Sequence, residues 1–402
     1  MKIVQINAIY GSKSTGTIAQ DIAECCKRNG IKPYAVYSIG PRFESTDGIR
    51  IGNVFVEKWH ALLSRIGGKQ AYFSRITTSR FLKTLDKIKP DIVHLHNLHS
   101  NYIHLNMLLR YLADRNIATV ITMHDCWYFT GGCTHYTAVG CFKWQKGCGK
   151  CPQRCDIKAY LFDSTAKILA DRRKYLTSIP RLVLVGASEW IANEAKKSLL
   201  SSVNITYIHN GFDFDVFKPC SSTLRRDLGI DNKKMILGPA SKWLSPVNKF
   251  TLDYFVSHMD ESTVLVLFGC TDMSLVLPSN VMLLGYTNSR QEMAELYSAA
   301  DVFVNCTIED TLSSINIECQ ACGTPVVTYD STGNKETVDF QRGFTVKSGD
   351  AESLWNRTKE VLKFGKSSYS NMCQDFVRQN FSKNNYLQYI ELYKDLMSNR
   401  EL

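Results

Sequence analysis

Residues 301–330, DVFVNCTIEDTLSSINIECQACGTPVVTYD, contain one complete building block of an α/β protein. DVFVNC and PVVTYD are short apolar runs rich in valine, as expected for buried strands. Between them, SINIECQACG has helical character and ends at a Gly-Thr-Pro turn. A strand, a loop, a helix and a second strand in this order predict a parallel βαβ unit.

The same alternation runs through both halves of the 402-residue chain. Further strand-like runs are KIVQINAIY, PYAVYSI, DIVHLHN, ATVITMH and LVLVGAS in the first half, and KMILGPAS, TVLVLFG and VMLLGY in the second. We therefore expect an α/β protein with two doubly wound, Rossmann-like domains that face each other across a cleft. The predicted parts are an N-terminal domain at 1–212 with a cysteine-rich insert at 126–155, a C-terminal domain at 213–375, and a helical tail at 376–402 that packs back across the domains.

Composition and charge narrow the class of protein. With 44% hydrophobic and 21% charged residues and no low-complexity tract, the chain is not a disordered protein. Residues 1–215 hold 29 Lys and Arg against 16 Asp and Glu, whereas residues 216–402 hold 19 against 22. The basic half is expected to prefer a phosphorylated substrate or an anionic membrane surface, unless it is only a solvated face. No nucleic-acid motif is present, so nucleic acid is not an expected partner.

The location of the protein is predicted from two features. No apolar run approaches the roughly 18 residues that a membrane-spanning helix needs. The start MKIVQINAIYG lacks the apolar core and the cleavage site of a signal peptide. We expect a cytoplasmic protein that contacts the inner membrane face only peripherally.

Two loops that precede predicted helices are candidate ligand sites. In YGSKSTGT, Gly16 allows a close backbone approach to a ligand, although an ordinary turn explains this loop equally well. In the opening stretch, Ser313 or Ser314 can cap the helix, and the free amides there can hold a diphosphate. Glu318 lies one turn further along and can reach hydroxyls. A diphosphate flanked by hydroxyls at both ends describes a nucleotide sugar.

The residues also carry a family resemblance. GYTNSRQEMAELYSAADVFVNCTIEDTLSSINIECQACGTPVVTYDSTGNKETVD, together with MHDCWYFTGGCTHY, GCGKCP and HNGFDFDVFKP, closely resembles family 4 retaining glycosyltransferases of the GT-B fold, particularly bacterial colanic-acid and exopolysaccharide enzymes. The resemblance implies transfer of a hexose-type sugar from a UDP- or GDP-sugar, bound by the C-terminal domain, to a saccharide held by the N-terminal domain. The acceptor is expected to be lipid-linked, and the product to be a cell-surface polysaccharide. Neither a metal nor a protein nucleophile is expected in catalysis.

The resemblance also assigns roles to residues. It places the acid that binds the nucleotide ribose on Glu318 and the first acid of the motif on Asp310, where Glu is commoner. It places a phosphate-binding lysine on Lys249, although Phe250 replaces the usual glycine and Leu244 an arginine. Thr311, Ser313 and Ser314 are the other candidate donor-binding residues of this stretch. Glu309 is expected to be a solvated bystander.

The histidines after two predicted strands have different predicted roles. His94 alternates with apolar residues and is expected in the core. His124 ends a strand and matches the family's active-site histidine, which holds the donor sugar. His96 and Asp125 are expected to support it. The sequence DFD at 213–215 resembles a metal-binding motif, but its place after Asn-Gly predicts a turn.

Four cysteines form a cluster inside the predicted insert. Cys133, Cys141, Cys148 and Cys151 fall within nineteen residues and end in a C-x-x-C motif, which suits a structural zinc ion. Reduced thiols packed in an acceptor-side loop, or disulfides, are the alternatives. Cys126 and Cys155 offer alternative ligands.

Two other functions are compatible with these patterns. The departures at Asp310, Leu244 and Phe250 would also fit a catalytically inactive, zinc-stabilised carbohydrate-binding or scaffold protein. A nucleotide-sugar epimerase on the same scaffold would need other acids, which we do not find.

Overall fold

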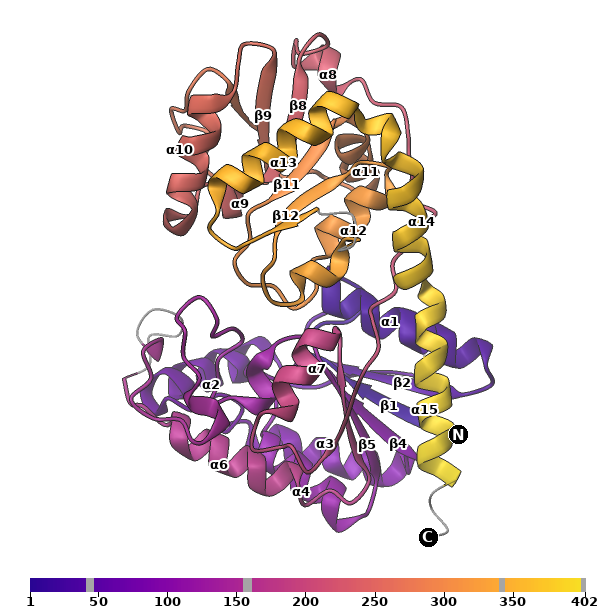
Figure 1. Ribbon diagram of the computed structural model, residues 1–402. Coiled ribbons are helices and arrows are strands. Elements are labelled where there is room, and N and C mark those ends of the chain that lie inside the picture. Colours follow the sequence, from indigo (N-terminus) through magenta and orange to yellow (C-terminus); the bar gives the residue numbers. More distant parts are fainter. Residues whose placement is uncertain (41–46, 155–160, 340–343, 399–402) are drawn as a thin grey trace. The chain divides into compact units, whose positions relative to one another are not determined.

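The computed structural model describes residues 1–40, 47–154, 161–339 and 344–398, which form two compact units (Figure 1). Unit 1 comprises Met1–Asn210 and Asn384–Leu402, and unit 2 comprises Gly211–Lys383. The residues predicted as one tail at 376–402 are thus divided between the units. The division follows the apolar side chains, because Phe381 packs into the core of unit 2 whereas Tyr389 and Tyr393 pack into a core of unit 1.

Unit 1 is built on a seven-stranded sheet in the order β3-β2-β1-β4-β5-β6-β7, in which all paired strands are parallel. Its strands are β1 (Lys2–Ile6), β2 (Lys32–Tyr37), β3 (Gly48–Arg50), β4 (Ile92–Leu95), β5 (Ala118–Met123), β6 (Leu182–Gly186) and β7 (Asn204–Tyr207). Ile6 pairs with Leu95, and Leu95 with Ile121, so the carboxyl ends of the three central strands reach one edge together. Loops that follow these strands therefore meet there.

Helices cover this sheet and connect its strands, as expected for parallel strands. They are α1 (Lys13–Arg28), α2 (Val54–Gly67), α3 (Arg75–Ile88), α4 (Leu105–Asp114), α6 (Thr165–Leu176), α7 (Glu189–Lys196) and α15 (Leu387–Ser398), with the short helices η1 (Cys126–Phe129), η2 (Lys143–Gln145) and η7 (Lys383–Tyr386).

The last helix, α15, is joined to the sheet of unit 1 by buried hydrogen bonds. His94 Nδ1 lies 2.7 Å from the Tyr393 hydroxyl, and His94 Nε2 lies 2.7 Å from Thr122 Oγ1. Thr122 Oγ1 lies 2.7 Å from the Tyr389 hydroxyl. Burial lowers the pKa of His94 to about 3, so this side chain is a neutral structural group. The predicted core position of His94 is confirmed.

Unit 2 has a six-stranded, all-parallel sheet in the order β10-β9-β8-β11-β12-β13. Its strands are β8 (Lys234–Pro239), β9 (Thr263–Phe268), β10 (Val281–Leu283), β11 (Val302–Asn305), β12 (Val326–Tyr329) and β13 (Thr345–Val346). Its helices are α8 (Leu224–Asp227), α9 (Ala240–Trp243), α10 (Lys249–His258), α11 (Arg290–Ala299), α12 (Ser314–Ala321), α13 (Ala351–Phe364) and α14 (Ser370–Asn380), with η3 (Pro246–Asn248), η4 (Thr332–Thr337) and η6 (Lys366–Ser368). The opening stretch forms β11, α12 and β12, which confirms the predicted βαβ unit.

Two sheets of parallel strands flanked by helices confirm the predicted class of two doubly wound domains. None of the helices in the described ranges is long and apolar enough to cross a membrane. Asp213 Oδ1 accepts a hydrogen bond from the Asp215 N–H at 3.1 Å, which is the local turn chemistry predicted for residues 213–215.

Candidate active site

The central edge of the sheet in unit 1 carries a stacked pair of histidines. His96 follows β4 and His124 follows β5. Their rings stack with centroids 5.4 Å apart, and His96 Nδ1 lies 3.1 Å from His124 Nε2. On its other side, His96 Nε2 lies 3.0 Å from Gln5 Oε1 on β1. The predicted support of His124 by His96 is therefore present as a direct contact.

Taking the Gln5 Oε1 atom as the acceptor assigns the proton positions on both rings. With the Gln5 amide oxygen as acceptor, His96 Nε2 carries the proton, so His96 Nδ1 accepts a hydrogen bond from His124 Nε2. His124 Nδ1 then keeps a lone pair, and no group in the described ranges pairs with it. Burial, aided by the nearby His99, lowers the pKa of His124 to about 4. A neutral His124 at physiological pH is thus an acceptor for a hydroxyl group.

Asp125 anchors the loop that carries His124 rather than the His124 ring itself. Its Oδ2 lies 3.1 Å from His99 Nε2, and its Oδ1 accepts the Trp127 N–H at 2.9 Å. Burial alone would raise the pKa of Asp125, but these hydrogen bonds outweigh burial and lower it. Gln70 closes the arrangement by donating to His99 O and accepting from the Trp127 indole at 3.0 Å. The support predicted for Asp125 is therefore indirect.

Gly16 does not lie in a loop as predicted, because α1 already begins at Lys13. A Cβ at Gly16 would lie 3.2 Å from both the side chain and the carbonyl oxygen of Ile9. Close packing of α1 on the segment after β1 explains this glycine without a ligand. Its predicted role in donor binding stays a prediction.

In unit 2, a buried amide network holds the loop between β11 and α12. Asn305 Nδ2 donates to Ser313 Oγ at 3.1 Å and to Asn316 Oδ1 at 2.9 Å. Asn316 Nδ2 donates to Asn334 Oδ1 and Thr337 Oγ1 at 2.9 and 2.8 Å. Ser313 occupies the N-cap position of α12, but its side chain makes no capping hydrogen bond. The first amides of α12, from Ser314 on, are therefore not capped by the Ser313 side chain.

Asp310 and Thr311 differ in how they are held in this loop. The Asp310 backbone exchanges hydrogen bonds with Thr332, at 2.9 Å from Asp310 N and 2.6 Å to Asp310 O. The Asp310 carboxylate accepts from the Leu312 N–H at 3.3 Å. The Thr311 hydroxyl is buried and has no hydrogen-bond partner in the described ranges. A buried hydroxyl without a partner is costly unless a ligand or water satisfies it.

Glu318 lies on α12, one turn from its N-terminus, and is half-buried. The Tyr297 hydroxyl donates to its Oε2 at 3.4 Å. Burial raises the pKa of Glu318 to about 7, while the Arg290 guanidinium and the Tyr297 hydrogen bond oppose this rise. A strongly perturbed carboxyl group beside a helix N-terminus is typical of a functional site.

Lys249, a predicted donor-binding residue, is largely exposed and pairs with a surface carboxylate. Its Nζ lies 2.8 Å from Asp253 Oδ2 on the same helix, and its side chain is 75% exposed. The preceding residue, Asn248, is buried and donates to Lys242 O and Cys306 O at 3.0 and 2.9 Å. Asn248 therefore ties this segment to the carboxyl end of β11.

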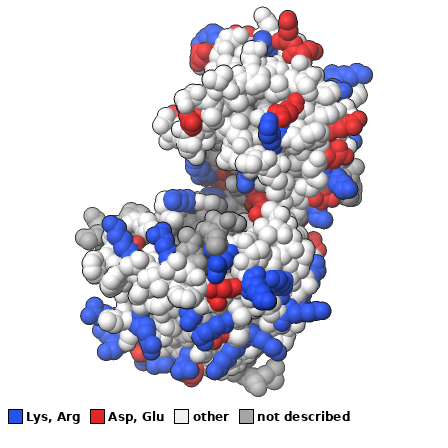
Figure 2. All heavy atoms as spheres, turned by 90° about the vertical axis from the view of Figure 1, so that its left-hand side faces the viewer, with Lys and Arg blue, Asp and Glu red and all other residues white. Residues whose placement is uncertain are grey.

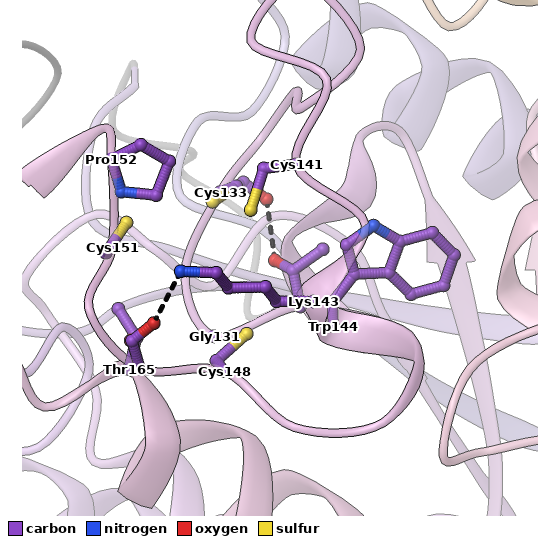
Figure 3. A pocket seen from close by; sticks show the side chains of 11 residues that line it. Gly131, Cys133, Cys141, Lys143, Trp144, Cys148, Cys151, Pro152 and Thr165 are labelled. Carbon is purple, nitrogen blue, oxygen red and sulfur yellow. Dashed lines mark hydrogen bonds between the residues drawn. The ribbon is translucent and has the colours of Figure 1, made fainter.

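The four predicted zinc ligands surround one small cavity of about 20 Å³ (Figure 3). Cys133, Cys141, Cys148 and Cys151 all line it, together with Lys143. The Cys133 thiol donates a hydrogen bond that lowers the pKa of Cys151, and the same bond raises the pKa of Cys133. In the part of the chain that the structure describes, no group of three or more His, Cys, Asp or Glu side chains is positioned to hold a metal ion. The zinc site stays a prediction, and Cys155 lies outside the described ranges.

Sequence reasoning missed several residues that shape the site. They are Gln5, Gln70, Asn248, Arg290, Tyr297, Asn305, Asn316 and Thr332. Asn305 ends a predicted strand directly before the loop, and a polar residue there was a usable signal. The other residues contact groups that lie further away in the sequence, and no local sequence pattern predicts such contacts.

Comparison with solved structures identifies the fold of this chain. A sucrose-phosphate synthase from Thermosynechococcus elongatus is similar over 99% of both chains, with a TM-score of 0.67 and 17% identity. Anabaena HepE, solved in complex with UDP-glucose, is similar over 99% of this chain and 100% of its own, with a TM-score of 0.62 and 16% identity. These likenesses confirm the predicted GT-B fold.

Family models then identify the family. Residues 15–216 match the model described as Glycosyltransferase Family 4, and residues 260–382 match the model described as Glycosyl transferases group 1. The chain belongs to glycosyltransferase family 4, as the sequence motifs predicted. A curated relative is the putative colanic acid biosynthesis glycosyl transferase WcaC of Escherichia coli K12, 23% identical over 297 residues and 68% of each chain.

Proposed function

We propose that this glycosyltransferase moves a hexose-type sugar from a UDP- or GDP-sugar to a saccharide acceptor, with retention of the anomeric configuration. The observation that carries this proposal is the arrangement at α12. Glu318 lies one turn from helix amides that Ser313 does not cap, and the loop before the helix holds the Thr311 hydroxyl, which has no partner in the described ranges. The amides and the hydroxyl suit a diphosphate, and the carboxyl group suits a ribose diol. HepE, which shares the fold, was solved with UDP-glucose.

Each proposed donor-binding residue has a distinct task. Thr311, Ser314 and the amides of α12 donate hydrogen bonds to the diphosphate, and Ser313 holds the loop. Glu318 accepts hydrogen bonds from the ribose. Asp310 faces a hydroxyl of the transferred sugar, and Lys249 leaves Asp253 to neutralise charge on the leaving nucleotide. A surface ion pair between residues four apart is worth only about 0.3–0.5 kcal/mol, so a diphosphate can displace it.

In unit 1, His124 supplies the contact to the reacting sugar. Its Nδ1 lone pair is held in place by the His96–Gln5 chain, so it can accept a sugar hydroxyl without reorganisation. We propose that the acceptor attacks from the face that the diphosphate leaves, with the diphosphate taking the acceptor proton. This scheme uses neither a protein nucleophile nor a catalytic metal ion.

The biological acceptor is proposed from the similarity to WcaC, whose name assigns it to colanic acid biosynthesis. We propose a lipid-linked saccharide at the cytoplasmic face of the membrane and a role in cell-surface polysaccharide synthesis.

Release of free nucleotide diphosphate from a panel of UDP- and GDP-sugars, with and without acceptor extract, tests the function. We expect acceptor-stimulated release with one donor, and loss of this release in Glu318→Ala. Glu309→Ala is the matched control, because it removes a carboxylate from the neighbouring loop that has no assigned role. Nucleotide binding without turnover of any donor would favour an inactive carbohydrate-binding protein.

We also propose that the four-cysteine cavity binds one structural zinc ion after its side chains rotate. The cavity is large enough for a single ion or water, and no cysteine in the described ranges forms a disulfide. Metal analysis of protein purified without chelator should give about one zinc per chain. Cys148→Ser should lose this zinc while Cys220→Ser, in unit 2, retains it. A metal-free wild-type protein would refute the zinc site.

A further inference from the structure

Helix α2 of unit 1 has a reversed distribution of polar and apolar residues. The two fully buried side chains of this helix are His60 and Ser64. Its exposed large apolar side chains include Phe55, Trp59, Leu62 and Ile66, which are 76%, 57%, 44% and 42% exposed. Water-facing helix surfaces normally carry polar residues, so this face lacks its expected solvent character.

The four exposed side chains form one stripe. They follow each other at intervals of four, three and four residues, which places them along a single face of a helix. Leu161 and Phe162, which are 65% and 64% exposed, lie beside its C-terminal end, where Leu161 N–H donates to Arg65 O at 2.9 Å. A contiguous apolar surface of this kind indicates an interaction site.

The helix is anchored so that it cannot turn this stripe inward. On its buried face, His60 Nδ1 lies 2.6 Å from Ser74 Oγ, and the His60 ring meets Phe73 edge-on at 5.6 Å. The helix begins at the Asn53 cap, whose side chain accepts the Val56 N–H at 2.9 Å. It ends at Gly68, where φ is +61° and a Cβ would collide with Phe162 O. These contacts fix the orientation of α2, so the apolar stripe faces away from the core of unit 1.

Cations accompany the stripe. Residues 54–69, which span α2 and the two residues after it, contain Lys58, Arg65 and Lys69 against one acid, Glu57. Lys58 and Arg65 are exposed on α2 itself, beside the stripe. Figure 2, which faces the side of unit 1 that carries α2, shows many Lys and Arg and few Asp and Glu around uncharged surface. An apolar helix face flanked by cations is typical of a helix that lies in the headgroup region of an anionic bilayer.

We propose that α2 docks unit 1 onto an anionic lipid bilayer, with Phe55, Trp59, Leu62 and Ile66 inserted among the acyl chains. Charge favours this occupant over a second copy of the chain, because two copies would bring two basic faces together. The docking would hold the acceptor domain where a lipid-linked saccharide is presented. Only this last consequence rests on the proposed function.

Co-sedimentation of the full-length protein with vesicles tests the docking. We compare phosphatidylcholine vesicles with vesicles that also contain phosphatidylglycerol. Wild type should bind the anionic vesicles at least about tenfold more tightly, and high salt should weaken this binding. Phe55→Ser/Trp59→Ser should lose binding by about tenfold or more. Phe364→Ser removes a side chain of unit 2 whose exposure (58%) is close to that of Trp59 (57%), and it should bind as wild type.

Further measurements separate the alternatives. Thermal melting of each variant confirms folding, and Lys58→Glu/Arg65→Glu should reduce anionic-vesicle binding without touching the apolar stripe. Equal binding to both vesicle types, or none, would overturn the proposal. So would a concentration-dependent dimer of wild type that disappears in Phe55→Ser/Trp59→Ser, because the stripe would then join two copies. Nucleotide diphosphate release with a detergent-solubilised acceptor should be unchanged in these variants, so failure of docking does not imply failure of the proposed function.

Discussion

The loops at the carboxyl ends of the two sheets are both held by buried hydrogen bonds, but the chemistry of these bonds differs. In unit 2, a network of buried amides from Asn305 to Asn334 shapes the loop and leaves donors at the helix N-terminus. In unit 1, two neutral histidines form a chain that ends in one acceptor, His124 Nδ1. From this contrast we propose a division of labour in which unit 2 binds an anionic nucleotide and unit 1 meets a neutral hydroxyl.

The largest expected effect is a loss of turnover after a substitution in unit 1. His124→Ala should lower turnover by about 10²-fold or more, because one oriented contact to the reacting sugar is lost. Binding of free UDP or GDP should stay within about twofold, because their proposed binding residues lie in unit 2. His258→Ala, an exposed histidine in unit 2, serves as control. Equal losses in nucleotide binding and turnover would contradict the division.

A second change tests the amide network of unit 2. Asn316→Leu should destabilise unit 2 by about 2–4 kcal/mol, because Asn305, Asn334 and Thr337 lose a buried partner. Urea denaturation checks this, with the exposed Asn288→Leu as control. A loss below about 0.5 kcal/mol would mean that the network does not shape the loop.

The raised pKa of Glu318 predicts a pH dependence of donor binding. Because this pKa is about 7, the carboxylate that accepts the ribose hydroxyls forms only as the pH rises through 7. Donor affinity should therefore be about tenfold higher at pH 8 than at pH 6. Titrations with an intact nucleotide sugar avoid the ionisation of a terminal phosphate. In Glu318→Gln this difference should disappear, and its persistence would assign the titration to another group.

The smallest effect concerns the exposed cation of unit 2. Lys249→Ala should weaken donor binding severalfold if the amine leaves Asp253 for the diphosphate. A charged hydrogen bond contributes about 1.5 kcal/mol, and loss of the Asp253 pair offsets about 0.3–0.5 kcal/mol of this, which leaves about 1 kcal/mol. Asp253→Ala frees the amine and should leave binding unchanged or slightly tighter. An unchanged affinity in Lys249→Ala would make this residue part of a surface ion pair only.

Local patterns predicted much of this molecule. The β11–α12–β12 unit, the core position of His94 and the family all followed from short stretches of sequence. The partners of Glu318 and the Gln5 contact of His96 did not. Tyr297 and Arg290 lie on α11, Gln5 lies on β1, and only the fold brings these distant parts of the sequence to the site. Gly16 was misplaced because α1 begins at Lys13, inside the stretch YGSKSTGT whose composition is typical of a loop. The reversed face of α2 also needed the structure, because an amphipathic pattern does not say which side is buried.

The central claim is that α12 and Glu318 bind the nucleotide of the donor. Calorimetric titration of UDP and GDP into wild type, Glu318→Ala and Glu309→Ala tests it most directly. We predict binding of one nucleotide by wild type, at least about tenfold weaker binding by Glu318→Ala, and a change within about twofold for Glu309→Ala. Equal affinities in all three proteins, or no binding of either nucleotide by wild type, would contradict the claim.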